Sequence, residues 1–229
     1  MPFGHPDAKK GNSYTIKIKN LKNIEAEFTK NPLFSALKKY EPATYDRVML
    51  ELHSGLQKGR SLAELRQKIL PLCESLYMRR LPYASDSALY SFTDLLLKQM
   101  KVLYAVDPSL CYDYVYEEGS RAKLNVTKYF SKELQEKEFL VMAEVIRSAA
   151  GQANRPPNEK QVQKQLESVV ASLANRYGDD VKMLDNPKMA RANKAKASIL
   201  IHEFFQTILT LPKRDCGMLL RFMFASVKK

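Results

Sequence analysis

Cysteine is scarce in this sequence, and the spacing of the few cysteines excludes the sites that usually need them. The three cysteines, Cys73, Cys111 and Cys216, lie far apart, and none belongs to a CxxC pair. Disulfide frameworks and thiolate metal sites use cysteines that are numerous or closely spaced. The sequence therefore predicts reduced thiols and neither a metal nor a cofactor. A single disulfide in an oxidising compartment is the alternative.

Glycine and histidine are also few, with 8 and 3 residues, and the motifs that depend on them are missing. The sequence contains no GxGxxG, no GxxxxGK followed by Ser or Thr, and no GxSxG. In those motifs glycine lets the backbone approach a phosphate or form the sharp turn that presents a nucleophile. We therefore favour a protein that is not an enzyme. An enzyme built from scattered residues would leave no such motif and stays the alternative.

His202 and Glu203 match only the first half of the zinc-binding pattern HExxH. Residue 206 is glutamine, so the second histidine ligand of that pattern is missing. Because both residues lie in a strongly apolar stretch, we predict that His202 is a buried, hydrogen-bonded structural residue. The competing interpretation is an enzyme with a pocket near His202 and Glu203, since an ionisable pair in an apolar helix can have a perturbed titration.

Long apolar runs are missing as well. The longest strongly apolar stretch, residues 198–211, has 14 residues and contains His202, Glu203 and Gln206. A helix that spans a bilayer needs about 20 apolar residues. The sequence thus predicts a soluble protein, cytoplasmic by default. Peripheral association with a membrane or envelope stays open if these residues belong to a longer protein.

What the sequence contains in abundance is helix start and stop signals. Asn31 precedes Pro32, and Ser61 with Glu64 forms a capping box, in which each residue satisfies a free N–H group of the other. Apolar residues then recur at spacings of three and four, as in amphipathic helices. Further starts are expected at Glu41, at Ser85 or Asp86, and at Asp107, Ser131, Asn158 and Asn186, with stops at Gly59, Gly119, Gly151 and Gly178.

These signals predict an all-α fold, an irregular multi-helix bundle of about eight or nine helices. The apolar fraction of 45% is sufficient for a sizeable core. We expect a single helical domain over residues 31–229. A lobe boundary near 151–158 is the alternative, because GQANRPPN is the most linker-like stretch of the chain.

The first 30 residues differ from the rest in composition. Gly, Pro, Asn and Lys are dense there, and Tyr14, Ile16 and Ile18 alternate with polar residues as in a short strand. An isolated strand leaves its backbone groups unpaired unless it finds a partner. We therefore expect residues 1–30 to form an extended basic arm, with a short strand as one option.

The last fifth of the chain is its most apolar part. Ile199, Phe204 and Ile208, with their neighbours, cover nearly all sides of one helix, as is typical of a central buried helix. After Pro212 a second apolar run contains Leu220 and Phe224. We expect this last helix to complete the core. Presentation of an apolar surface to a partner is the alternative.

Charge is unevenly distributed along the chain. Lys and Arg number 37 and Asp and Glu 25, which gives a formal net charge of +12. Residues 1–40 carry a net charge of +5 and residues 191–229 of +6, whereas the tyrosine-rich segment 82–120 carries −4. If the two ends converge in the fold, they form a basic surface that attracts anionic partners.

The leading hypothesis is therefore a non-enzymatic helical interaction module that engages an acidic protein or an anionic membrane surface. Nucleic-acid binding is a further alternative, supported only by the bulk positive charge, since neither a recognition helix nor an RNA-binding aromatic pattern is evident. We predict that Lys188, Arg191 and Lys194 share one flank of a helix. Together with Lys213 and Arg214 they are the candidate residues for binding the anionic partner.

Overall fold

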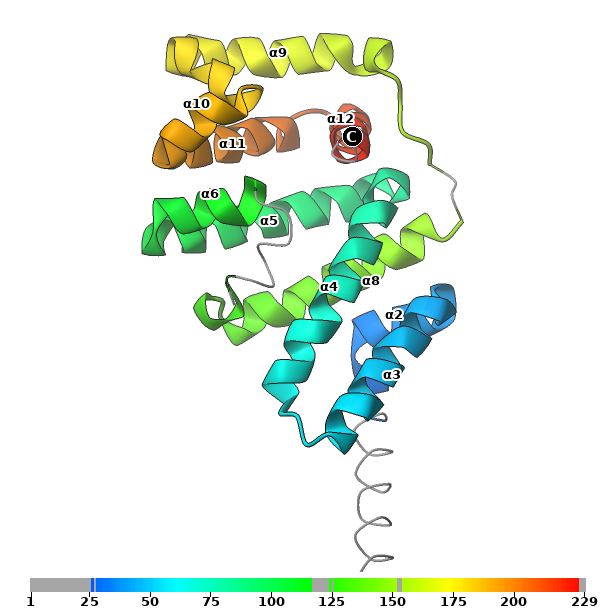
Figure 1. Cartoon of the computed structure of the whole chain (residues 1–229). Helices are drawn as coiled ribbons and strands as arrows, with labels where there is room; N and C mark the ends of the chain where they lie inside the picture. Colours follow the sequence, from blue (N-terminus) through cyan, green and yellow to red (C-terminus); the bar gives the residue numbers. More distant parts are fainter. Residues whose placement is uncertain (1–25, 27, 117–123, 125, 152–153, 227–229) are drawn as a thin grey trace, which may run out of the picture.

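The structure is a computed structural model that describes residues 26, 28–116, 124, 126–151 and 154–226. Within these ranges every regular element is helical, which confirms the all-α prediction (Figure 1). The α-helices are α2 (Pro32–Tyr40), α3 (Pro42–Gln57), α4 (Leu62–Arg80), α5 (Asp86–Val106), α6 (Pro108–Tyr116), α8 (Lys132–Ala149), α9 (Glu159–Tyr177), α10 (Pro187–Ala192), α11 (Lys194–Leu209) and α12 (Lys213–Ser226). The 3-10 helices are η1 (Leu81–Tyr83), η2 (Val126–Tyr129) and η3 (Gly178–Leu184).

Side-chain caps explain where the helices begin. Asn31 Oδ1 accepts the backbone N–H of Leu33 at 2.9 Å at the start of α2. Ser61 and Glu64 form the predicted capping box at the start of α4, and a second capping box begins α9 at Asn158. These contacts satisfy N–H groups that have no partner within the helix. The predicted starts at these three positions are therefore confirmed.

The segment after Asn186 forms two helices, not one. Asn193 interrupts the chain with φ −139° and ψ 73°, and its side-chain oxygen accepts the N–H of Lys196 at 3.1 Å, so it caps a new helix. Lys188 and Arg191 belong to α10, whereas Lys194 opens α11. The prediction that these three residues share one flank of a helix is therefore wrong. The physical reason is that an asparagine cap competes with helix continuation.

The helices stack in layers around α5, as Figure 1 shows. α5 and α6 lie in the middle, α8 below them, and α10, α11 and α12 above, with α9 covering the top. α4 crosses the lower part and packs on α3 and α8, while α2 packs between α3 and α8. α5 therefore has neighbours on both sides, which suits its run of buried apolar residues.

The C-terminal helix completes the core, as predicted. Leu219, Leu220 and Phe224 on α12 are buried, and the Phe224 ring contacts Phe92 of α5 edge-on at a centroid distance of 5.4 Å. The main hydrophobic cluster contains side chains from helices throughout the described chain, α2 to α12. Leu220 and Phe224 are thus unavailable to an outside partner.

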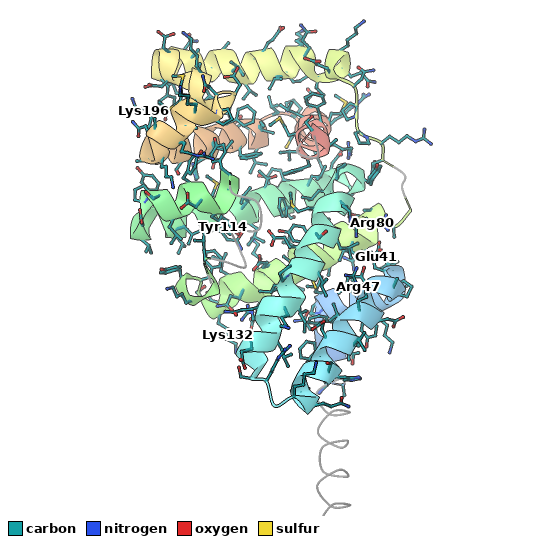
Figure 2. The ribbon with its side chains drawn as sticks, in the orientation of Figure 1. Glu41, Arg47, Arg80, Tyr114, Lys132 and Lys196 are labelled. Carbon is teal, nitrogen blue, oxygen red and sulfur yellow. The ribbon has the colours of Figure 1, made fainter. Side chains whose placement is uncertain are left out.

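Ion pairs connect distant parts of the chain inside this framework. Glu41, between α2 and α3, pairs with Arg80 at the end of α4 (Figure 2). Arg221 of α12 is buried, and its guanidinium donates to Asp86 Oδ1 at 2.5 Å and to the Ala84 carbonyl at 3.1 Å. The second pair fixes α12 to the start of α5.

Gly217 allows α12 to approach α5 this closely. A Cβ atom at this position would lie 2.2 Å from Asp86 Oδ1 and 2.3 Å from its Cγ. Those distances are far below van der Waals contact, so any larger residue displaces the Asp86 carboxylate. The carboxylate occupies the space that glycine leaves, one helical turn from Arg221.

The predicted N-terminal arm and strand lie almost entirely outside the described residues. Within residues 1–30, Ala26 and residues 28–30 are helical, and the Phe28 ring contacts Phe34 of α2 at a centroid distance of 4.7 Å. The stretch proposed as a lobe boundary, 151–158, is the connection between α8 and α9. Within the described ranges, no helix combines the length and apolar character required to cross a membrane.

Candidate functional site

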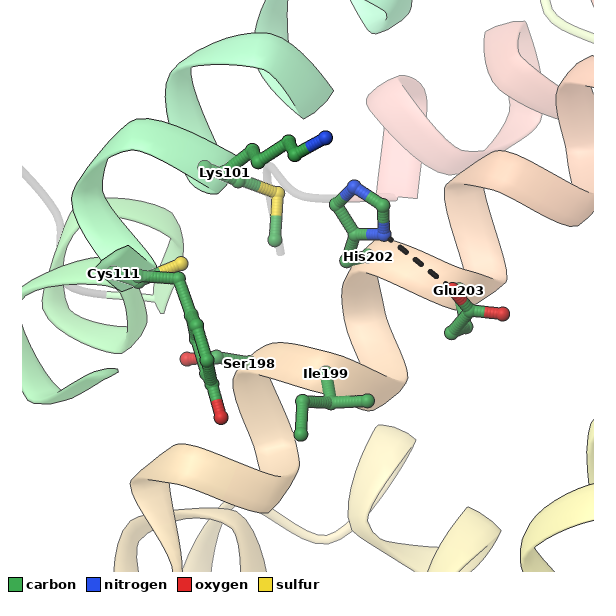
Figure 3. Close-up of a pocket in the computed structure, with 8 residues that line it drawn as sticks. Lys101, Cys111, Ser198, Ile199, His202 and Glu203 are labelled. Atoms are coloured by element: carbon green, nitrogen blue, oxygen red, sulfur yellow. Dashed lines mark ion pairs between the residues drawn. The ribbon is translucent and has the colours of Figure 1, made fainter.

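A pocket of about 280 Å³ opens between α5, α6 and α11. It lies next to His202 and Glu203. The alternative hypothesis from the sequence, an enzyme, predicted a pocket at this position. Helical spacing explains its composition, since residues separated by three and four positions share a face of a helix. The lining residues are Met100, Lys101 and Tyr104 of α5, Cys111 of α6, and Ser198, Ile199, His202 and Glu203 of α11 (Figure 3).

The floor of the pocket is buried and the mouth is open. Met100 and Cys111 are each 1% exposed, whereas Ile199 is 38% exposed. Ser198 Oγ donates to the Pro108 carbonyl at 3.2 Å and so holds the start of α6 against α11. The pocket is therefore a gap between helices whose relative position is fixed by packing and by this hydrogen bond.

His202 is not the buried, hydrogen-bonded residue that the sequence predicted. Its side chain is 30% exposed and lines the pocket. Its Nδ1 atom lies 3.6 Å from Glu203 Oε1 (Figure 3), a distance too long for a hydrogen bond. The prediction failed because the pocket interrupts packing on this side of α11, although the helix is apolar on most of its circumference.

Glu203 is held by a residue from outside the pocket. Arg176 of α9 donates from Nη1 to Glu203 Oε2 at 2.7 Å and from Nη2 to Thr207 Oγ1 at 3.1 Å. The pair leaves the Glu203 side chain 27% exposed. The guanidinium thus compensates the only carboxylate among the described lining residues and directs one of its oxygens away from His202.

Lys101 is the cationic side chain of the lining. It forms no ion pair with a described residue and extends along α5 on the same side as the His202 ring (Figure 3). Other lysines of this region are paired, since Lys98 and Lys137 both contact Asp94, at 2.9 Å and 3.1 Å. The Lys101 charge is therefore the uncompensated charge of the described pocket.

The Cys111 thiol is a poor nucleophile. Burial raises the pKa of Cys111 above its ordinary value, and a side-chain interaction with Ser198 opposes this only in part. Since the thiolate is the reactive form, a raised pKa reduces reactivity near neutral pH. All three cysteines are buried and free, and burial also raises the pKa of Cys73, to about 12, and of Cys216, to about 11.

The five residues predicted to bind an anionic partner do not form one surface. Lys194 is bound within the protein, because its Nζ lies 2.6 Å from Asp113 Oδ1 and 5.3 Å from the centre of the Tyr112 ring. The other four are exposed and have no ion partner within the described chain. α11 separates them into two pairs, with 16 residues that span about 24 Å. The pairs are Lys188 with Arg191 and Lys213 with Arg214.

The described parts of the two basic ends also lie apart. α2 packs on α3 and α8 below α5, whereas α11 and α12 pack on α5 and α9 above it (Figure 1). Two acidic side chains of η3, next to α10, are compensated, because Asp180 pairs with Lys196 at 2.8 Å and Asp179 with Lys182 at 2.7 Å. In the part of the chain that the structure describes, no cluster of three or more His, Cys, Asp or Glu side chains is placed to hold a metal ion.

The comparisons with protein families, curated proteins and solved structures give no match. The function is therefore inferred from the geometry of this chain. The sequence pointed to His202 and Glu203 and to the tyrosine-rich segment 82–120, which contains Tyr104, but Met100 and Lys101 were missed. One signal was present: Lys101 is one of only two basic residues in the acidic segment 82–120.

Proposed function

We propose that this chain is a small-molecule-binding protein whose ligand occupies the pocket between α5, α6 and α11. One observation carries the proposal. The pocket has a buried apolar floor, and above it lie two polar side chains that make no hydrogen bond with described residues. Lys101 has no ion pair in the described chain, and His202 has no polar contact shorter than its 3.6 Å approach to Glu203. Pockets that bind small molecules combine a mostly apolar lining with a few polar groups in this way.

Binding fits the lining better than covalent chemistry. A nucleophile needs a base within hydrogen-bond distance, and the base needs a third group that orients it. Cys111 has a raised pKa, and the carboxylate of Glu203 is engaged by Arg176. The volume of about 280 Å³ is close to the lower end of the range for ligand pockets, roughly 300 Å³, so the ligand is small.

Ligand-observed NMR with a diverse set of small molecules tests the proposal. The variant Ile199→Trp places a larger side chain at the mouth and should abolish binding. Leu50→Trp is the matched control, because Leu50 is 69% exposed on α3, which does not line the pocket. Compounds that bind the wild type and Leu50→Trp but not Ile199→Trp support the proposal. A screen in which Ile199→Trp retains every ligand contradicts it.

An acidic protein partner at α10 is the second candidate function. Lys188 and Arg191 are exposed without an ion partner in the described chain, and the exposed Met189 lies between them. This surface is smaller than the combined basic face predicted from the sequence. Leu220 and Phe224 are buried and cannot insert into a membrane. Binding to an anionic membrane would therefore depend mainly on electrostatic attraction.

Charge reversal separates the anionic partners. Lys188→Glu/Arg191→Glu should weaken capture of an acidic protein from cell extract, with Lys213→Glu/Arg214→Glu as the control of equal charge change. Anionic liposomes and a DNA duplex are measured in parallel at low and physiological salt. If both double variants capture the acidic protein equally weakly, the attraction is nonspecific and depends on net charge alone. Binding to liposomes or duplex in preference to protein would favour those partners instead.

A further inference from the structure

We propose that the ligand of this pocket is a small organic acid, with its carboxylate beside Lys101 and His202 and a compact apolar body on the floor. The inference rests on the proposed function and names the chemical class of the ligand. It depends on the positive charge of Lys101, which no other lining residue compensates.

The local charges favour an anion. Among the described lining residues Glu203 is the only carboxylate, and Arg176 binds it at 2.7 Å. Asp94, on the same helix as the lining residues of α5, accepts hydrogen bonds from both Lys98 and Lys137. The Lys101 ammonium therefore has no anionic partner in the described surroundings, and a ligand carboxylate would supply one.

A neutral donor beside Lys101 suits the same group. His202 lines the pocket and carries an imidazole N–H in either tautomer. Figure 3 places the Lys101 side chain and the His202 ring on one side of the pocket, and Cys111 and Ser198 on the other. The oxygen atoms of a ligand carboxylate on this side can therefore accept hydrogen bonds from the Lys101 ammonium and from the imidazole N–H of His202.

The rest of the pocket fits an uncharged, apolar body of limited size. Met100 forms a buried floor, Ile199 flanks the mouth, and the Tyr104 ring contributes a further apolar surface. The volume of about 280 Å³ lies near the lower end of the range for ligand pockets, roughly 300 Å³, so a compact body fits it. A six-carbon acid satisfies both the volume and the position of the charge.

NMR titrations of the full chain with hexanoate, 1-hexanol and hexylamine test this inference. Hexanoate should bind more tightly than the other two probes, and Lys101→Met should weaken hexanoate binding about two- to fivefold, the ratio expected of a partly exposed ion pair. The same variant should leave 1-hexanol unchanged. Lys164→Met is the matched control, because Lys164 is an exposed lysine of α9 outside the pocket.

The outcomes separate this inference from the proposed function. Hexanoate preference that disappears in Lys101→Met and persists in Lys164→Met supports the inference. If 1-hexanol or hexylamine binds as tightly as hexanoate and Ile199→Trp blocks it, the pocket binds ligands but the acid class is overturned. If no probe and no compound of the wider screen depends on Ile199, the proposed function and this inference both fail.

Discussion

The Arg221–Asp86 pair gives an asymmetric prediction, because its two partners differ in burial. The Arg221 side chain is 7% exposed and that of Asp86 is 35% exposed. We expect Asp86→Asn to destabilise the fold more than Arg221→Met does. Asparagine retains the shape and one acceptor oxygen but leaves the buried guanidinium without a compensating charge. Methionine removes the buried charge altogether, and the remaining carboxylate can be hydrated.

The expected loss in the free energy of unfolding depends on which charge or polar group each substitution leaves without a partner. Removal of one partner from a buried ion pair costs about 3 to 5 kcal/mol when an uncompensated charge stays buried. Because asparagine still accepts a hydrogen bond, we expect about 3 kcal/mol for Asp86→Asn. Arg221→Met loses the donor to the Ala84 carbonyl, worth about 1 to 2 kcal/mol. It also removes the buried Nε atom, which has no hydrogen-bond partner in the described structure.

Urea denaturation of the wild type, both single variants and the double variant measures these terms. The sharpest expectation concerns the double variant: addition of Arg221→Met to Asp86→Asn should raise the free energy of unfolding by about 1 kcal/mol, because it removes the orphaned charge. An unchanged m value shows that the unfolded reference is the same. If Arg221→Met costs more than Asp86→Asn, or if the double variant is the least stable, the argument from burial is refuted.

Three further predictions concern packing, pH and the pocket histidine. Gly217→Ala should lower the free energy of unfolding by about 1 to 3 kcal/mol through overpacking against the Asp86 carboxylate, whereas Gly151→Ala, with open space around it, should change it by less than about 0.5 kcal/mol; equal effects in urea denaturation would contradict this. Burial raises the pKa of Cys73 and of Tyr116 to about 12, so stability should be full below about pH 9 and fall as the pH rises toward 12; a flat pH profile would oppose it. His202→Ala should cost less than about 1 kcal/mol, because this side chain is 30% exposed; a larger shift of the melting temperature would restore the structural role predicted from sequence.

Local chemistry made the helices predictable from sequence. The caps at Asn31, Ser61 and Asn158 act within three or four residues, so their residue types alone indicate where a helix begins. The break at Asn193 uses the same chemistry, but no proline or glycine accompanies it, and the apolar pattern continues across it. The helices on either side were therefore merged in the prediction.

Site residues were less predictable because they depend on which helices become neighbours. His202 and Lys101 are separated by about a hundred residues, and only the packing of α11 against α5 places them in one pocket. Partial exposure of His202 follows from that packing and from no feature of its own helix. Pairing of Lys194 with Asp113 is equally nonlocal, and it removed one of the five cations expected to face a partner.

The position of α5 has a consequence for synthesis of the chain. Its upper side is covered by α11 and α12, which are synthesised after α9, whereas α8, which covers the lower side, is synthesised much earlier (Figure 1). The apolar upper side of α5 and the buried surface of η1 therefore stay uncovered until residues beyond 194 have emerged. At about 5 to 20 residues per second, the 120 residues from the end of α5 to the end of α12 take about 6 to 24 seconds to make. During that interval the nascent chain presents the surface that chaperones bind, and a ribosome stalled shortly after α9 should hold α5 in a state that proteases cut.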